Sequence, residues 1–415
     1  MKSFFISNSF LIFVLLVNFM PYLGSIDVLA TQWFYIATIN ALFLIFSKNI
    51  FIPKNILFII FSFFIFQAFI SLSYSNNLNV SLVDFFRFFS VFLLIFILSN
   101  RITTQTFNFY NISLLVSLTL VIEVFYSLDF LFSFINLNGV GNLYRFNENY
   151  QEINFIGFAG NKNITAASIA VKFPFLFYLF FKSKNFIKYL IIIFSFFLFT
   201  SIFLLKARSV FLSLGIVLII SIVYFFYKRK FIFGVFLLPI ICSFLFSSFL
   251  IGDDSSNSIT GDIRSIQFSK ESSNDRLLLW DNALSYISDN PFIGAGIGNW
   301  KIESIPYWKT HLSSYIVPYH AHNDLLEITT ELGILGGLTF LSVFLISFYL
   351  LIRFFFKSYS DFNSSLVIFI VFTSLLIYFV DVNLNFPNER PRMQVMFAIL
   401  IFIVMSLTTN KSLEK

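Results

Sequence analysis

The feature that most restricts the fold of this chain is a series of long apolar stretches that recurs along the whole sequence. A helix needs roughly 20 apolar residues to cross the hydrocarbon core of a bilayer. About twelve stretches of this kind occur, centred near Leu15, Ile39, Ile65, Phe92, Val121, Phe173, Phe194, Leu218, Pro239, Val343, Phe372 and Leu400. The sequence therefore predicts an all-α polytopic membrane protein with about 12 transmembrane helices.

The composition excludes a soluble globular protein of this size. Of the 415 residues, 58% are hydrophobic and only 12% are charged, which is too little charge to cover a soluble surface. The net charge of +6 could indicate nucleic-acid binding. However, Lys and Arg stand in short clusters between apolar stretches, as in loops that face anionic lipid. We expect membrane lipids and no nucleic acid as partners. The single cysteine, Cys242, lies in an apolar run, so no disulfide framework is expected.

The basic residues predict the orientation of the chain. The segment from about Phe4 to Leu23 lacks a small-residue cleavage site and precedes many further spans, so we interpret it as the first helix and not as a signal peptide. With Lys2 in the cytoplasm, alternate loops are cytoplasmic and hold Lys48, Lys54, Arg101, Lys182, Lys184, Lys188, Lys228, Arg229, Lys230, Arg353, Lys357, Lys411 and Lys415. The opposite short loops at 25–30 and 75–81 hold no basic residue. This asymmetry predicts that both termini are cytoplasmic.

Two long polar segments interrupt the series on the outer side, at about 136–163 and at 252–324. Loops of that length are usually functional or disordered. The second divides the chain into N-terminal transmembrane helices (1–251, about nine), one large extracytoplasmic loop with short helices (252–324) and C-terminal transmembrane helices (325–415, about three). The first part of this loop, 253–274, is rich in Ser and Asn and predicts a flexible stretch.

The second part of the large loop predicts an amphipathic helix at the membrane surface. From Arg276 to Ile287 the apolar residues follow near-helical spacing, and the helix should end at Asn290-Pro291. Arg276 could bind a ligand or extend towards lipid headgroups. The glycines that follow, at 294, 296 and 298, permit a tight backbone path against a ligand or another chain segment.

All three histidines, His311, His320 and His322, fall in one short region of the loop. A histidine titrates near neutral pH and suits a general base. Zinc is a rival use of the three, but no strong ligand spacing is present, and we expect no metal. Asp324 could instead cap the following helix, with Glu327 as its capping-box partner. That structural explanation leaves His322 without a role.

The segment 206–209, Lys-Ala-Arg-Ser, lies at the outer end of another span. Arg208 would stand at a helix N-terminus, where free amides and the helix dipole favour an anion, so the segment could bind a diphosphate. Basic residues could also merely end the helix in the interface. Their position on the outer side, against the positive-inside trend, favours a functional role.

Other charged residues have several interpretations. Arg87 lies one helical turn from Asp84, which predicts a structural ion pair. Lys172 falls near the middle of a span, where an ionisable group is costly and indicates function; a neutral or a cavity-facing lysine both remain open. Residues 385–392 form a further polar outer turn, which includes Arg390 and could border the same site.

These segments resemble the O-antigen ligase and polymerase family over about residues 200–340. The characteristic loop of that family is similar to the run Arg276, Trp280, Pro291, Gly294 and Gly296. The ligase motif is similar to His322-Asn323 followed by Gly333 and Gly337, although Gly336-Gly337-Leu338 stands where the motif often ends in Gly-Thr. The segment 206–209 resembles the family's Ser/Thr-Arg element, with Ala207 in place of the usual hydroxyl residue.

The resemblance implies a metal-independent, inverting glycosyltransferase of the bacterial inner membrane with a periplasmic large loop and no cofactor. It implies a polyprenyl-diphosphate-linked glycan as the donor and a glycolipid or lipid-linked glycan as the acceptor. Arg208, Arg276 and Lys206 would hold the diphosphate, and His322 would deprotonate the acceptor hydroxyl. Candidates for supporting roles are His320, Asn323, Asp324, Glu331 and Arg390.

Three functions are compatible with this pattern. We favour a ligase that transfers the glycan to lipid A-core or a similar acceptor, over a polymerase that uses the same donor. A polysaccharide transporter is the third alternative. It would place functional charges along a path through the membrane, often between pseudo-symmetric halves. The candidate residues gather at the outer face instead, with Lys172 as the main exception.

Overall fold

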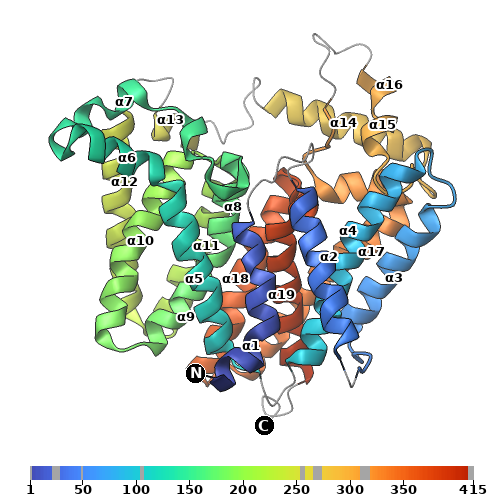
Figure 1. Ribbon diagram of the computed structural model, residues 1–415, viewed down its shortest axis with the longest axis horizontal. Coiled ribbons are helices and arrows are strands. Elements are labelled where there is room, and N and C mark those ends of the chain that lie inside the picture. Colours follow the sequence, from blue (N-terminus) through green and yellow to red (C-terminus); the bar gives the residue numbers. More distant parts are fainter. Residues whose placement is uncertain are drawn as a thin grey trace. The chain divides into compact units, whose positions relative to one another are not determined.

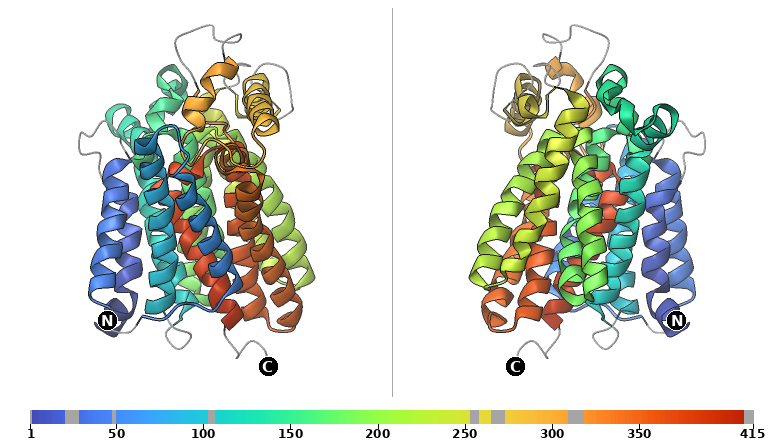
Figure 2. Two further views of the ribbon diagram at one scale, coloured as in Figure 1. Left: turned by 90° about the vertical axis from the view of Figure 1, so that its right-hand side faces the viewer. Right: turned by 90° about the vertical axis from the view of Figure 1, so that its left-hand side faces the viewer.

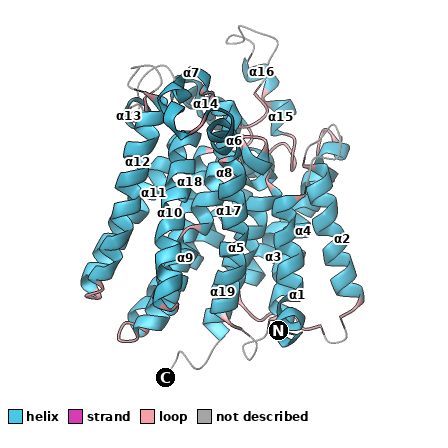
Figure 3. Ribbon diagram, turned by 60° about the vertical axis from the view of Figure 1, so that its left-hand side comes forward, coloured by secondary structure: helices cyan, strands magenta, loops and turns pink. Residues whose placement is uncertain are grey.

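The computed structural model describes residues 2–20, 29–47, 50–102, 107–252, 258–264, 273–308 and 318–409. Within these ranges every regular element is a helix (Figure 3), which confirms the all-α prediction. Nine helical stretches among the described residues are long and apolar enough to cross a membrane. Three shorter apolar stretches, Asn8–Phe19, Ala30–Ile45 and Ile56–Ser71, account for the remaining predicted centres. Because of their length, the count of twelve crossings stays a prediction.

The chain forms two compact units. The first comprises Met1–Phe107, Ser269–Ser358 and Asp381–Lys415, and the second comprises Asn108–Phe268 and Tyr359–Val380. Asparagine side chains begin long helices in both units, because an N-cap side chain accepts a hydrogen bond from a free amide of the first turn. These caps are Asn55, Asn77, Asn108, Asn161 and Asn323.

In the first unit, α3 packs against α17, α4 packs against α2 and α19, and α14 packs against α17 (Figure 1). The helices of this unit are α1 (Lys2–Leu15), α2 (Ala30–Ile45), α3 (Ile56–Ser71), α4 (Leu78–Arg101), α14 (Ser273–Asp289), α15 (Trp300–Glu303), α16 (Ile305–Trp308), α17 (Asp324–Lys357) and α19 (Pro391–Thr409). Short 3-10 turns, η1 (Leu16–Phe19) and η6 (Pro387–Glu389), complete it. α14 to α16 lie at the end of the unit where α17 begins (Figure 2).

In the second unit, α10 packs against α12, and α5 packs against α8 and α9. Its helices are α5 (Phe109–Ser127), α6 (Asp129–Asn138), α7 (Phe146–Asn149), α8 (Lys162–Lys172), α9 (Pro174–Lys182), α10 (Asn185–Leu205), α11 (Arg208–Tyr227), α12 (Leu237–Ile251), α13 (Ile259–Arg264) and most of α18 (Phe362–Leu384). Four 3-10 turns join them: η2 (Val140–Arg145), η3 (Glu152–Phe155), η4 (Gly157–Ala159) and η5 (Phe231–Phe236). Pro174 separates α8 from α9, because proline lacks the amide that would continue the helix.

The described part of residues 252–323 contains only the helices α13 to α16, none of which qualifies as a membrane span, and α17 begins at Asp324. This agrees with a loop that carries short helices, while its place outside the cytoplasm stays a prediction. The amphipathic helix expected over 276–287 is α14, and it ends at Asp289 directly before Asn290-Pro291, as predicted. Most of the stretch 253–274, and His311, lie outside the described residues.

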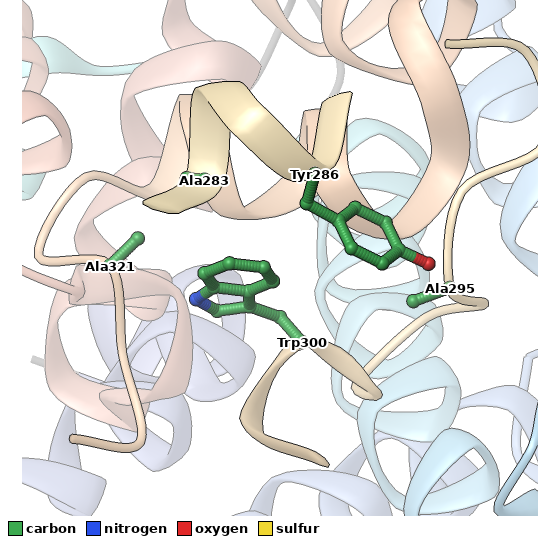
Figure 4. Packing of buried hydrophobic residues seen from close by; sticks show 5 residues of the cluster. All are labelled: Ala283, Tyr286, Ala295, Trp300 and Ala321. Carbon is green, nitrogen blue, oxygen red and sulfur yellow. The ribbon is translucent and has the colours of Figure 1, made fainter. Parts of the chain in front are cut away.

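A small aromatic core holds the short helices together. Ala283 and Tyr286 of α14 pack with Ala295, Trp300 and Ala321, all less than 9% exposed. Figure 4 shows the Trp300 indole between α14 and the loop that carries Ala321. Because Ala321 stands next to His322, this core fixes the position of the histidine turn relative to α14.

Candidate functional site

The glycine-rich segment after α14 docks against a break in α17. Gly333 has a φ of 70° and a ψ of 179°, so the helix is interrupted at this residue. Three backbone hydrogen bonds join the segment to the break: Ala295 N to Thr330 O (2.9 Å), Gly296 N to Glu331 O (2.8 Å) and Ile334 N to Pro291 O (2.8 Å). The segment thereby satisfies groups that the break leaves without a partner in the helix. We predicted that these glycines allow the backbone to lie close to a ligand or to another chain segment. In the structure they lie close to another chain segment, the break in α17.

Replacement of Gly294 by alanine is expected to destabilise this docking. The residue has a φ of 69°, and a Cβ atom would lie 2.6 Å from backbone atoms of Thr330 and Glu331, which cannot rotate away. A left-handed alanine alone costs about 1–2 kcal/mol, and the clash adds to it. The measurement is the thermal unfolding of the purified variant in detergent.

Gly215→Ala is the matched control. Gly215 lies inside α11, and a Cβ atom there would meet no atom within 4 Å. Alanine in a helix interior is stabilising by about 0.5–1 kcal/mol relative to glycine. If Gly294→Ala unfolds no earlier than Gly215→Ala, the docking described above does not limit stability.

Glu331, a predicted supporting residue, ties the docked segment down further. Its carboxylate is buried and accepts hydrogen bonds from the backbone N–H groups of Trp300 (3.2 Å) and Gly298. Gly298 in turn lies against Asp84, because a Cβ atom would stand 2.2 Å from Asp84 Oδ2. Glu331 therefore connects α17 to the segment between α14 and α15.

His322 lies in the tight turn that precedes α17. Its φ of +52° is a left-handed conformation that residues other than glycine rarely adopt and that clusters at functional sites. Its Nδ1 atom is buried and has no hydrogen-bond partner among the described residues. Buried polar atoms are nearly always paired, so an unpaired one marks a candidate for catalysis or for binding.

The cap of α17 differs from the prediction. Asn323, not Asp324, is the N-cap: its backbone is extended, and its Oδ1 accepts from Leu326 N (3.1 Å). Asp324 is the first helical residue, and its carboxylate accepts the backbone N–H of Asn388 (2.9 Å). The predicted capping box of Asp324 and Glu327 is therefore wrong by one residue, because Asn323 is the N-cap. Glu327 binds the turn that precedes α17 instead.

His320 is held between two carboxylates. Its Nδ1 atom lies 3.0 Å from Glu327 Oε1, and its Nε2 atom lies 3.1 Å from Glu389 Oε2. Glu327 also accepts the backbone N–H of Ala321 (2.9 Å). Burial alone would lower the pKa of His320, but the two carboxylates outweigh it and raise this pKa well above the ordinary value. Burial alone would raise the pKa of Glu389, but His320 helps to lower it to about 2.

An ion-pair network extends from Glu389 to α4. Arg87 Nη1 lies 3.2 Å from Glu389 Oε1 and 2.7 Å from Asp84 Oδ1, which confirms the predicted pair of Arg87 and Asp84. Lys301 Nζ lies 3.4 Å from Asp84 Oδ2. The segment around Glu389 is thus fixed to α4 through Arg87, and α15 is fixed to α4 through Lys301.

Arg390 and Phe386 complete the surroundings of the two histidines. Phe386 stacks on His320 with the ring centroids 4.5 Å apart, and it meets His322 at 5.0 Å with the ring planes at 79°. The Arg390 guanidinium lies over the Phe386 ring, 4.6 Å from its centre. Arg276 at the start of α14 is close enough for its charge to act on His322 and on Asp381.

The charges around His322 favour the neutral imidazole. Burial lowers the pKa of His322, and the positive charges of Arg276, His320 and Arg390 lower it further, to about 4. At neutral pH the ring is therefore uncharged and has a free site for a proton, although a pKa of about 4 makes it a weaker base than the ordinary histidine that the sequence analysis expected. The two arginines beside it provide planar, paired donors of the kind that bind phosphate oxygens.

A cavity of about 30 Å³ lies against Glu327 and Glu389, the two carboxylates that hold His320, and its volume suffices for ordered water. It is lined by Asp84, Arg87, Phe88, Asp324, Glu327, Ile328, Glu331, Asn388 and Glu389. Five of these nine residues are acidic, so the cavity does not suit a diphosphate. Among the described residues, no group of three His, Cys, Asp or Glu side chains is arranged to hold a metal ion.

Lys206 and Arg208 belong to the second unit. Arg208 is the first residue of α11, as predicted, so it stands beside the free amides of a helix N-terminus. Lys206 ends α10 in a left-handed conformation, with a φ of 52°, and its side chain is buried. Lys206 and Arg208 thus place two basic residues in the short connection between α10 and α11.

Lys172 also lies in the second unit, and its side chain is completely buried. Its Nζ atom lies 2.7 Å from Glu123 Oε2 and 2.9 Å from Ser168 Oγ. The lysine thus has an acidic partner on α5 that the sequence analysis did not identify. Both are ionisable residues within apolar spans, which was the only signal that could have linked them.

The structure brings most of the predicted residues together. His320, His322, Asn323, Asp324, Glu331, Arg276 and Arg390 all belong to the first unit and lie around the start of α17. The sequence analysis missed Glu389 and Phe386. Both lie in the polar turn 385–392, which had been linked to the site only through its position.

The apolar helices define a polytopic membrane protein, and the polar cluster at the start of α17 is its candidate site. A family model described as O-antigen ligase matches residues 193–341, which include Lys206, Arg208, Arg276 and His322. This match supports the resemblance to the O-antigen ligase and polymerase family that the sequence motifs predicted. The comparison with curated proteins gave no match.

Proposed function

We propose that the chain is an O-antigen ligase-like glycosyltransferase that moves a glycan from a polyprenyl diphosphate to the hydroxyl of an acceptor, such as lipid A-core. The observation that carries this proposal is His322: a neutral imidazole in a left-handed turn, close to the charges of Arg276 and Arg390. The family match supports lipid-linked glycan substrates within the membrane.

In the proposed reaction, His322 takes the proton of the acceptor hydroxyl while the hydroxyl oxygen attacks the anomeric carbon of the donor. The bond from this carbon to the diphosphate oxygen breaks, and its electron pair leaves with the lipid diphosphate. Such a leaving group needs positive charge more than a general acid. Arg276 would supply this charge, and Arg390 would support it. The scheme inverts the anomeric carbon and invokes neither a metal nor a cofactor.

The proposed location is the bacterial inner membrane, with both termini in the cytoplasm and residues 252–324 in the periplasm. The distribution of Lys and Arg supports this orientation. Donor and acceptor are both lipids, so the site must lie where the outer leaflet meets the periplasm. α14, with exposed Leu277 and Leu284 on one side and a buried face on the other, suits such a boundary.

Deletion of the gene in its host tests the proposal. Surface glycans are analysed by gel electrophoresis and mass spectrometry, with the wild-type gene returned as the control. If the protein is a ligase, the deletion strain is expected to keep long glycan chains on the polyprenyl carrier and to have none on the acceptor. Single repeat units on the acceptor would instead indicate a polymerase. Unchanged glycans on deletion would contradict both functions.

Arg276→Ala is expected to lower the transfer rate by about 100- to 1,000-fold, the usual effect of losing one preorganised group that stabilises developing charge. Arg276→Lys should restore only part of the rate, because lysine keeps the charge but not the paired donors. The measurement uses membranes and lipid-linked glycan extracted from the deletion strain. At pH 8 the imidazole of His322 is neutral in every variant, so the test reports on Arg276 alone.

The control for this variant is Arg353→Ala, an exposed arginine near the far end of α17. It should transfer glycan at the wild-type rate. A wild-type rate in Arg276→Ala would remove Arg276 from the proposed site.

A further inference from the structure

The two ring nitrogens of His320 both face carboxylate oxygens, at 3.0 Å from Glu327 and 3.1 Å from Glu389. An ionised carboxylate can only accept a hydrogen bond. Each nitrogen must therefore carry a proton for both contacts to be hydrogen bonds. The geometry alone indicates an imidazolium ring, which is chemically opposite to the neutral ring of His322 two residues later.

The carboxylates that hold His320 are themselves fixed by separate parts of the first unit. Glu327 lies in the first turns of α17 and also accepts the N–H of Ala321 (2.9 Å), so it holds the backbone of the turn. Glu389 is bound by Arg87 of α4 (3.2 Å), and its backbone oxygen accepts from Trp33 Nε1 of α2 (3.2 Å). The imidazolium thus joins the turn before α17 to the segment before α19.

Phe386 carries this connection to His322. The His320 ring and the Arg390 guanidinium lie 4.5 Å and 4.6 Å from the centre of the Phe386 ring. The π-electrons of the ring attract a cation that lies over its face. The His322 ring packs against the same ring at 79°. A shift of His320 would therefore move the ring that supports His322.

We propose that His320 is the positioning residue of the site: a fixed imidazolium, clamped by Glu327 and Glu389, that holds the His322 turn and places a permanent positive charge beside His322. This inference deepens the proposed function and rests on it, because it assigns His320 to the working of the His322 base. His320 itself does not exchange a proton with substrate in this scheme.

The charged neighbours determine the expected pH dependence. His322 faces the positive groups Arg276, His320 and Arg390, and the negative group Glu327. Removal of the positive charge of His320 takes away one of the causes that lower the pKa of His322, so this pKa should rise towards its ordinary value. Since His322 must be neutral to act, the rate would then be lost at a higher pH than in the wild type.

The experiment is the pH profile of glycan transfer by the full-length protein in membranes, with lipid-linked glycan from the deletion strain. In the wild type the acid limb is expected near pH 4. In His320→Gln the midpoint should move upwards by about one pH unit, and the rate above this limb should also fall. A lower rate with an unmoved midpoint would overturn the proposal, since loss of a merely structural contact does not change the titration of His322.

Glu389→Gln is the second variant, and it decides the matter if His320→Gln fails to fold. The new amide keeps the shape of the side chain and an oxygen for Arg87, but one of the two charges that hold the proton on His320 is lost. The ring should then lose its proton at a lower pH than in the wild type, so the rate should begin to fall at a lower pH as the pH rises above neutrality. An alkaline limb at the same pH as in the wild type would contradict the clamp.

His322→Ala, measured in parallel, separates this inference from the proposed function. If His322→Ala transfers glycan at the wild-type rate, the proposed base is wrong, whatever His320 does. If His322→Ala is inactive while both other variants keep the wild-type pH profile, only the role of His320 is wrong.

Discussion

Replacement of His322 by alanine is expected to reduce the rate of glycan transfer by about 100- to 10,000-fold, the range associated with a positioned general base. The reason is chemical: the imidazole is neutral at physiological pH and can take the proton of the acceptor hydroxyl. The measurement is transfer from extracted lipid-linked glycan by membranes that contain equal amounts of each variant.

The left-handed backbone of His322 complicates the alanine variant and calls for a better-matched one. Alanine at a φ of +52° is strained by about 1–2 kcal/mol, so part of its effect could be a distorted turn. Asparagine tolerates this conformation better than most residues but cannot serve as a base near neutral pH. His322→Asn should therefore unfold like the wild type and still be inactive.

A neighbouring position provides the positive control. The side chain of Tyr319 is 66% exposed, so Tyr319→Ala should keep the wild-type rate. An active His322→Asn variant would contradict the assignment of His322 as the base. Loss of activity in Tyr319→Ala as well would show that the turn tolerates no change, and the two His322 variants would then not identify a base.

The sequence predicted the elements of the first unit better than their connections. Hydropathy located the helices because each apolar stretch must satisfy its backbone within one helix in a membrane. The spacing from Arg276 to Ile287 located α14 for a similar reason, since an amphipathic helix repeats every 3.6 residues. Both signals are local, and neither requires knowledge of distant residues.

The clamp around His320 could not be predicted in this way. Glu389 lies 69 residues from His320 in the sequence, and only the packing of α17 and α19 brings the two together. The same holds for Phe386, which looked like an ordinary apolar residue of a polar turn. The helix cap was misplaced because Asn323 and Asp324 are both good N-cap residues, and the sequence alone could not choose between adjacent positions.

The sequence left the role of Lys172 open, and its ion pair with Glu123 in the structure now leads to a specific expectation. Both side chains are at most 3% exposed, and their charged atoms lie 2.7 Å apart between α8 and α5. Ser168 Oγ lies 2.9 Å from the lysine Nζ and 3.1 Å from Glu123 Oε1. Removal of one partner would leave the other charge buried without its counter-ion.

We therefore expect Lys172→Met to destabilise the protein by about 3–5 kcal/mol, the usual cost of breaking a buried pair. The double variant Lys172→Met with Glu123→Leu should recover most of this loss, because two apolar residues of similar volume leave no charge behind. The measurement is thermal unfolding in detergent, and Lys184→Met, at an exposed lysine just before α10, is the control.

Recovery in the double variant also separates a structural role from a functional one. If the pair only stabilises the second unit, the double variant should regain both its unfolding temperature and its transfer rate. If the pair were part of a path for protons or ions through the membrane, as a transporter requires, stability would return while function stayed lost. A double variant that is stable and active would therefore argue against the transporter alternative, and one that is as unstable as Lys172→Met would contradict the ion-pair explanation itself.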